Sequence, residues 1–165
     1  MIVLGIDPGT AITGYGFIRE ANGSLQLVAY GAITTPADWA LPQRLVRLHR
    51  ELSELIALHR PASAAVEQLF FSRNVRTALA VGQARGVTLL ALAQAGIPIS
   101  EYTPLEVKQA VTGYGRADKQ QIQEMVRILI GLPGIPKPDD AADALAIAIC
   151  HLHSSHISGL VPASQ

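Results

Sequence analysis

The sequence predicts an α/β fold, in which one sheet carries helices on both of its faces. Two observations support this class: three runs with strand character come first, and segments with helical periodicity then alternate with short apolar runs. The length of 165 residues fits one domain, which can bury about two thirds of the surface of its unfolded chain. We expect one domain over residues 1–157 and a flexible tail over residues 158–165.

The first part of the chain predicts three successive antiparallel strands. Ile2–Asp7 is a short apolar run that ends in a carboxylate, and Tyr15–Arg19 is the second strand. Asn22-Gly23 follows, a dipeptide typical of a tight hairpin turn, and Leu25–Ile33 then forms the third strand.

Helices and short strands alternate in the rest of the chain. A helix is predicted from Leu41 to His59, because its apolar residues recur every three or four positions. Pro61 ends this helix, and Ala64–Glu67 follows as a buried strand that also ends in a carboxylate. The later elements are a helix over Val75–Gln94, a strand over Ile97–Thr103, and helices over Pro104–Val111, Lys119–Ile130 and Asp139–His153.

Composition and charge exclude several classes of protein. Hydrophobic residues make up 49% and charged residues 16%, which excludes a disordered polyelectrolyte. No apolar run approaches the ~18 residues of a membrane span. The first residues lack the positive start of a secretory signal, and Cys150 is a lone cysteine, so we expect a cytoplasmic protein. Lys+Arg 13 balance Asp+Glu 13, so bulk charge alone argues against a nucleic-acid partner.

Four acidic residues stand at the ends of predicted elements. Asp7 and Glu67 each end a strand, and Asp140 and Asp143 lie on one face at the start of the last helix. If the first and fourth strands are neighbours, Asp7 and Glu67 lie within a few ångströms of each other, and a helix start beside them completes a cluster of four carboxylates. Such a cluster needs a counter-charge, and Mg²⁺, which prefers oxygen ligands, supplies it. For Asp140 and Asp143 alone, capping of the helix N-terminus is an equally simple explanation.

Five stretches of the sequence are informative together: GIDPGT around Asp7, VEQLFF from Val66, ALAVGQARG from Ala78, KQAVTGYGRADKQQIQEMV from Lys108 and DDAADALAIAICH from Asp139. They closely resemble the RuvC family of crossover junction endodeoxyribonucleases. The resemblance runs in order from Ile2 to about His153. It implies a ribonuclease H-like fold with a five-stranded mixed sheet, and a homodimer that nicks two strands of a four-way DNA junction using Mg²⁺ or Mn²⁺.

The resemblance also implies roles for individual residues. The family's four acidic metal ligands correspond to Asp7, Glu67, Asp140 and Asp143, and its catalytically important lysines to Lys108 and Lys119. Two metal ions would activate a water and stabilise the departing 3′ oxygen, which leaves 5′-phosphate and 3′-hydroxyl ends. Asp139 matches no ligand position, so we interpret it as a helix N-cap.

Aromatic and basic residues near these acids predict contacts with DNA. Phe70 matches the family's junction-stacking aromatic, and stacking on a base contributes about 1–3 kcal/mol. Its neighbour Phe71 is better explained as a core residue. Arg73, Arg76 and Arg116 are expected to meet phosphates, the last from a glycine-rich loop that a plain flexible turn explains equally well.

Symmetric cutting by one active site per chain requires a two-fold assembly. The predicted helix from Val75 carries small residues along one stripe, which permit close packing against the sheet or a second protomer. The small residues are Ala78, Gly82, Gly86 and Ala93. The resemblance favours the dimer, and it further implies a branch-migration motor of the RuvA and RuvB type as a partner.

Other interpretations remain open from the sequence. GIDPGT also resembles the phosphate loop of actin-like sugar kinases and chaperone ATPases, which need two lobes and a longer chain. A structured-RNA nuclease of the same fold and a catalytically silent junction-binding scaffold are further alternatives. The cluster of Cys150, His151, His153 and His156 could be called a zinc site, but cationic histidines at a helix C-terminus explain it better.

The balanced charge changes meaning if the four acids hold metal. Nine acidic residues then face 13 basic ones, because four of the 13 acids belong to the proposed site. Bound divalent ions would cancel the charge of those four, so a loaded chain carries about +4 and a dimer about +8. The neutral composition is therefore an average over an acidic centre and a basic surface.

Overall fold

The computed structural model describes residues 1–68 and 75–160, with the backbone alone for residues 156–160. Within these residues the strands are β1 (Ile2–Asp7), β2 (Ile12–Ala21), β3 (Ser24–Thr34), β4 (Ser63–Glu67) and β5 (Ile99–Tyr102). The helices are α1 (Leu41–His59), α2 (Val75–Gln94), α3 (Pro104–Thr112), α4 (Lys119–Ile130) and α5 (Asp139–Leu160). No helix in this part of the chain is both long and apolar enough to cross a membrane.

The strands form one mixed sheet in the order β3-β2-β1-β4-β5. Strands β1, β2 and β3 pair antiparallel, whereas β4 runs parallel to β1 and β5 parallel to β4. Asn22 and Gly23 both have positive φ, as the predicted two-residue hairpin turn requires. The predicted α/β class, with three antiparallel strands followed by parallel ones, is confirmed.

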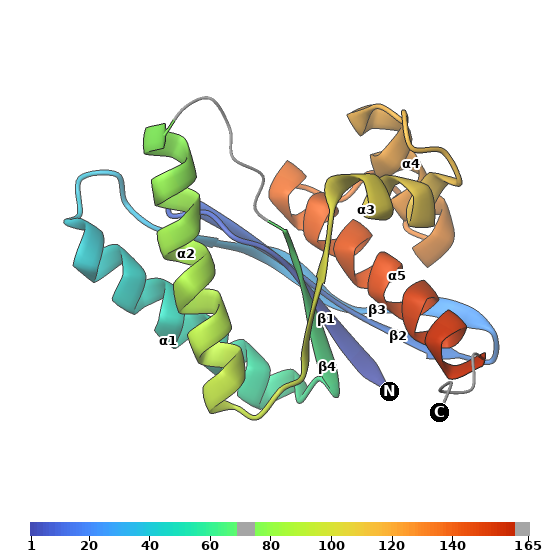
Figure 1. Cartoon of the computed structure of the whole chain (residues 1–165), viewed down its shortest axis with the longest axis horizontal. Helices are drawn as coiled ribbons and strands as arrows, with labels where there is room; N and C mark the ends of the chain where they lie inside the picture. Colours follow the sequence, from blue (N-terminus) through green and yellow to red (C-terminus); the bar gives the residue numbers. More distant parts are fainter. Residues whose placement is uncertain (69–74, 161–165) are drawn as a thin grey trace, which may run out of the picture.

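Helices cover both faces of this sheet, as expected (Figure 1). Helices α1 and α2 lie on one face, over a core that includes Leu4, Ile6 and Phe17. Helices α3, α4 and α5 cover the other face, where Val3 and Ile18 point. Neighbouring residues of β1 thus enter different cores, because successive side chains of a strand point to opposite faces.

Three predicted elements differ from the structure by two or more residues at an end. Strand β2 begins at Ile12 and ends at Ala21, because its pairing with β3 continues to both ends of the hairpin. Strand β5 begins only at Ile99, since the backbone N–H of Ile97 donates to Leu92 O and closes α2 instead. Helix α5 runs to Leu160, beyond the expected end at His153, so residues 158–160 of the expected tail are helical; residues 161–165 lie outside the described part.

Helix α5 comes directly against the backbone of the sheet at Gly5 and Gly14. A Cβ atom added to Gly14 would lie 1.9 Å from Asp140 O, and one added to Gly5 would lie 2.1 Å from Ala144 O. The helix in turn presents small, fully buried residues there, including Ala141 and Ala144. Glycines in β1 and β2 therefore set the height of α5 above the sheet.

Among the described residues, Cys150 and the histidines near the end of α5 form no zinc site, and His151 is not a cationic helix end. His151 is buried, with one ring nitrogen 2.8 Å from Ser63 Oγ and the other 3.0 Å from Tyr102 Oη. Burial lowers the pKa of His151, which keeps the ring neutral, and raises the pKa of the buried Cys150 thiol to about 11. His153 Nδ1 lies 3.1 Å from Ala110 O, and the side chain of His156 lies outside the described residues.

We predict that Gly14→Ala impairs any activity of the α5 N-terminus more than Gly16→Ala does. The new methyl group at Gly14 meets backbone atoms of Asp140 and Ala141, so the start of the helix must move. At Gly16 the nearest atoms, at 2.6 and 2.8 Å, belong to the Leu145 side chain, which can adopt another rotamer. Thermal unfolding and nuclease rates of both variants measure the difference. If the two variants are equally stable and lose equal activity, the distance of α5 from the sheet does not control the activity.

We also predict that the free energy of unfolding depends on the protonation of His151. The folded chain holds this ring at a pKa below 6.5, so the contribution of the neutral ring is present above pH 6.5 and is lost as the pH falls below it. Between pH 6.5 and 5 the free energy of unfolding should fall by up to about 1.4 kcal/mol per pH unit more in the wild type than in His151→Gln. Denaturant unfolding at several pH values measures this, and parallel curves for the two proteins would contradict it.

Candidate active site

The topology brings the four predicted acids to one edge of the sheet. Strands β1 and β4 are parallel neighbours, and Ile6 pairs with Val66, so Asp7 and Glu67 end adjacent strands at the same level. Asp7 pairs with Gly14 of β2 on its other side, and the backbone of Gly14 touches that of Asp140. Asp143 follows one turn later in α5. Two strand ends and one helix start therefore position the set.

The pKa shifts show that these acids act on one another. Burial, followed by the charges of Asp143, Glu67 and Asp140, raises the pKa of Asp7 to about 7. Burial and Asp143 also raise the pKa of Glu67. The pKa of Asp143 is raised as well, because burial raises it more than the nearby Lys119 lowers it. The site has an excess of negative charge that its own lysines do not neutralise.

The carboxylates do not surround a common point. Among the described residues, no group of three or more His, Cys, Asp or Glu side chains is arranged to hold a metal ion. The expectation that the four acids form one metal-binding cluster therefore stays a prediction, since their side chains are not arranged as a metal site here. Like-charged carboxylates repel without a cation between them, and Lys119 holds Asp143 in an ion pair instead. The donors still fit a hard divalent cation, because they are all carboxylate oxygens around an uncompensated charge.

Lys119 is the first residue of α4, and its ammonium group bridges two acids of α5. Its Nζ lies 3.3 Å from Asp143 Oδ2 and 3.5 Å from Asp139 Oδ2. Asp139 is not the N-cap that we expected. The backbone N–H groups of Ala141 and Ala142 donate to Pro138 O, so Pro138 occupies the cap position and Asp139 is the first helical residue. Its side chain is free to face α4.

Lys108 of α3 joins the same site from the side. With Glu67, Lys119 and Asp143 it lines a cavity of about 240 Å³ between α3, α4 and α5. Its charge lowers the pKa of Glu67, although burial and Asp143 raise that pKa more strongly. Both predicted lysines therefore lie beside the carboxylates, whereas the walls further in are apolar, including Val107 and Ile147.

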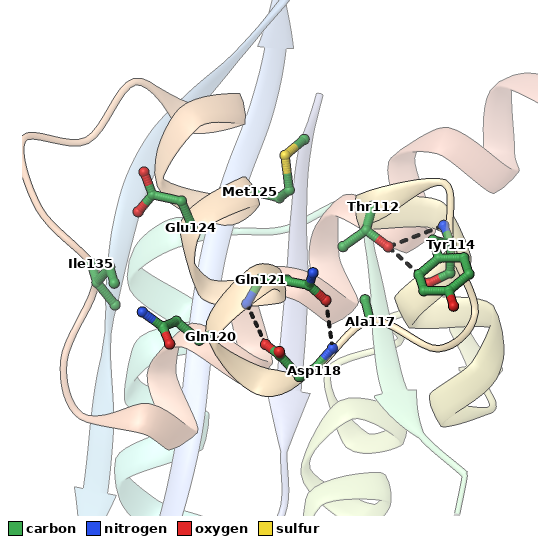
Figure 2. Close-up of a pocket in the computed structure, with 9 residues that line it drawn as sticks. All are labelled: Thr112, Tyr114, Ala117, Asp118, Gln120, Gln121, Glu124, Met125 and Ile135. Carbon is green, nitrogen blue, oxygen red and sulfur yellow. Dashed lines mark hydrogen bonds between the residues drawn. The ribbon is translucent and has the colours of Figure 1, made fainter.

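The loop between the two lysine-bearing helices is held by local hydrogen bonds (Figure 2). Asp118 and Gln121 form a reciprocal capping box, with both bonds 2.9 Å long, on either side of Lys119 in the sequence. Thr112 Oγ1 accepts from Tyr114 N and donates to Lys108 O at the end of α3. The larger cavity of about 530 Å³ that Figure 2 shows beside this loop includes none of the four predicted metal ligands.

The predicted DNA-contacting residues are only partly visible. Phe70, Phe71 and Arg73 lie outside the described residues. Arg76 is exposed in the first turn of α2, and Arg116 is exposed in the loop between α3 and α4. Two of the predicted arginines therefore lie at the surface. Arg116 also lies close to Lys119 in the sequence.

Sequence reasoning missed the residues that support the site. Thr13 is fully buried and bonds the backbone of Gly9 in both directions, which fixes the loop after Asp7. Gln123 Nε2 donates to Asp139 Oδ1 at 3.1 Å. This bond, and then the charge of Lys119, lower the pKa of Asp139. A glutamine at a buried position of an amphipathic helix is the signal that could have revealed this contact.

Comparison with known proteins gives one consistent result. The family model described as crossover junction endodeoxyribonuclease RuvC matches residues 3–151. Proteins of that name are similar over almost the whole chain. The protein from Rubrobacter xylanophilus is 60% identical and covers 95% of this chain and 88% of the relative. The protein from Chloroflexus aurantiacus is 63% identical and covers 94% of each chain.

A solved structure agrees with the sequence relatives. The structure of T. thermophilus RuvC in complex with Holliday junction substrate is 36% identical, has a TM-score of 0.91 and covers 96% of both chains. Its fold is ribonuclease H-like, so the predicted fold class is confirmed. The chain belongs to the RuvC family, the crossover junction endodeoxyribonucleases.

Proposed function

We propose that this protein is a structure-selective endonuclease that resolves four-way DNA junctions by paired, symmetric nicks. The observation that carries the proposal is the gathering of Asp7, Glu67, Asp140 and Asp143 at one sheet edge, beside two lysines. The charge there is negative and uncompensated, which suits cations that in turn bind phosphate. A RuvC protein of the same fold has been solved in complex with a Holliday junction substrate, which supports the choice of DNA.

The four acids would hold the metal ions on which this family of nucleases depends. We propose two Mg²⁺ ions per site, with Mn²⁺ able to substitute, because only hard carboxylate oxygens are offered. Bound ions would supply the Lewis acidity that activates the attacking water and stabilises the departing 3′ oxygen. Asp7, whose pKa its burial and the three other acids raise, would be one of the ligands that hold these ions. The products would be 5′-phosphate and 3′-hydroxyl ends.

The lysines would bind the phosphate at the cut. Lys108 and Lys119 approach the carboxylates from α3 and α4, on one side of the cavity that also exposes Glu67 and Asp143. A charge-assisted hydrogen bond from either lysine would orient the scissile phosphate against the metal site. Phe70, Arg73, Arg76 and Arg116 would contact the junction outside the site, Phe70 by stacking on a base.

Helix α2 offers a surface for the two-fold assembly that paired nicks require. Its outward side carries Val75, Leu79 and Leu90, all exposed, at the spacing of a helix seam. Between them, Gly86 faces open space, with nothing within 4 Å of a Cβ added there. We propose that two copies pair through this face, where the small-residue stripe permits close approach of the helices.

Further partners and location follow from the family. The resemblance supports cooperation with a branch-migration motor of the RuvA and RuvB type. The similar proteins come from bacteria, whose chromosomal DNA lies in the cytoplasm, so we expect the protein to act there. Activity on structured RNA, or junction binding without cutting, would instead indicate one of the two alternative functions.

The proposed function predicts that Asp7→Asn abolishes cutting but retains junction binding. The wild type with Mg²⁺ should cut a mobile synthetic four-way junction and leave linear duplex intact, while the variant loses ~10³-fold or more in rate. Gel assays of binding and cutting on the same labelled junction measure both. A wild type that binds the junction and leaves it uncut would contradict the enzymatic function.

A stability measurement on the same variant excludes simple misfolding. The pKa of Asp7 is raised in the folded chain, so its ionisation destabilises the fold as the pH rises from about 4 to 7. At pH 8 in EDTA, the free energy of unfolding of Asp7→Asn should therefore be about 1–3 kcal/mol higher than that of the wild type. Mg²⁺ should stabilise the wild type and have little effect on the variant. Destabilisation by Asp7→Asn would mean that this carboxylate has a structural role instead.

The proposed dimer predicts that Leu79→Glu yields monomers. Leu79 is 62% exposed in the single chain, so the substitution should leave the stability of the monomer almost unchanged. Ile128→Glu is the matched control, because Ile128 is equally open on α4, on the other face of the sheet. Sedimentation should give a monomer for the first variant and a dimer for the second. A dimeric Leu79→Glu protein would place the interface elsewhere.

A further inference from the structure

We propose that Asp139 is a positioning residue that keeps Lys119 at the active site when Asp143 is engaged by a cation. The inference rests on the proposed function, in which Asp143 holds metal and Lys119 binds phosphate. Asp139 corresponds to none of the family's ligand positions that the sequence matches, so its carboxylate is available for another task.

Lys119 has two carboxylate partners on α5, and they lie one helical turn apart. Asp143 Oδ2 lies 3.3 Å from Nζ and Asp139 Oδ2 lies 3.5 Å from it. Residues four apart face the same side of a helix, so a single ammonium group can bridge them. The capping box of Asp118 and Gln121 fixes the backbone at the start of α4, which leaves the lysine side chain as the movable part.

Asp139 is itself held in one orientation. Its Oδ1 accepts a hydrogen bond of 3.1 Å from Gln123 Nε2, and Gln123 is only 7% exposed. The second oxygen, Oδ2, is the one that faces Lys119. Lys137 also pairs with Oδ1, at 3.4 Å, but its side chain is 72% exposed, and an ion pair that is open to water holds the carboxylate weakly. Gln123 therefore anchors one oxygen of the carboxylate and leaves the other oxygen to pair with Lys119.

The two partners of Lys119 differ in what a cation does to them. A cation that recruits Asp143 withdraws one of the two carboxylates from the lysine, and its positive charge repels the ammonium group. Without a second partner the long side chain would move into solvent and lose its place beside the phosphate. Asp139 remains available, because Gln123 of α4 holds its Oδ1 and leaves Oδ2 beside Lys119.

The test measures how well Lys119 is shielded from a limiting dose of an amine-reactive ester, by mass spectrometry of the labelled peptide. In Mg²⁺, Asp139→Asn should raise the labelling of Lys119 about two- to fivefold over the wild type, the size expected for a lost exposed ion pair. In EDTA the increase should be smaller, because Asp143 still holds the lysine. Junction cutting by the variant should slow about 3- to 30-fold in kcat, with the half-saturating Mg²⁺ concentration unchanged.

Two further variants serve as controls. Gln123→Met keeps the charge of Asp139 but removes its anchor, so it should give a smaller increase in Lys119 labelling in Mg²⁺. Lys137→Gln removes the other lysine on Asp139 and should leave Lys119 labelling at the wild-type level. Asp139→Asn should retain the full rise in Tm on adding Mg²⁺, because Asp139 does not bind the metal in this proposal.

The outcomes separate this inference from the proposed function. If the wild type cuts junctions and Asp139→Asn leaves the labelling of Lys119 unchanged, the positioning role is overturned. Loss of the Mg²⁺-dependent rise in Tm would overturn it too, because Asp139 would then be a metal ligand. Failure of the proposed function shows differently, as a wild-type protein that leaves the junction uncut.

Discussion

The contact on which the rest of the structure depends is the backbone-to-backbone packing of α5 on β1 and β2. Gly5 and Gly14 leave no room for a Cβ atom, and Ala144 and its neighbours bring the helix down onto the strands. This close contact places the first turn of α5 beside the end of β1. It sets the distance between Asp140 and Asp7 through the backbone, so the position of the site does not depend on flexible side chains.

This packing holds together charges that repel each other. Burial and three neighbouring acids raise the pKa of Asp7 to about 7, which is a cost to the folded chain that a bound cation removes. The repulsion between the carboxylates also explains why, among the described residues, they are not arranged to hold a metal ion. Lys119 offsets part of the charge from α4, and Asp139 and Gln123 give that lysine a partner outside the metal site.

Most of the fold and the four acids could be predicted from the sequence. Periodicity located α1 and α4 to the residue, and the carboxylates that end β1 and β4 marked the edge of the sheet. The start of β5 and the cap of α5 could not be predicted, because backbone hydrogen bonds of Ile97 and Pro138 decide them and leave no pattern in the sequence. The partners of His151 lie 49 and 88 residues away, and Gln123 lies 16 residues from Asp139, so only the tertiary structure reveals these contacts.

The central claim is that α5 and the sheet edge together form one metal site from Asp7, Glu67, Asp140 and Asp143. Anomalous scattering from a crystal of the protein grown with Mn²⁺ tests it most directly. The account predicts Mn²⁺ between the end of β1, the end of β4 and the first turn of α5, in contact with these carboxylates. Mn²⁺ bound only elsewhere, or Mn²⁺ held by Asp139 in place of Asp143, would contradict it.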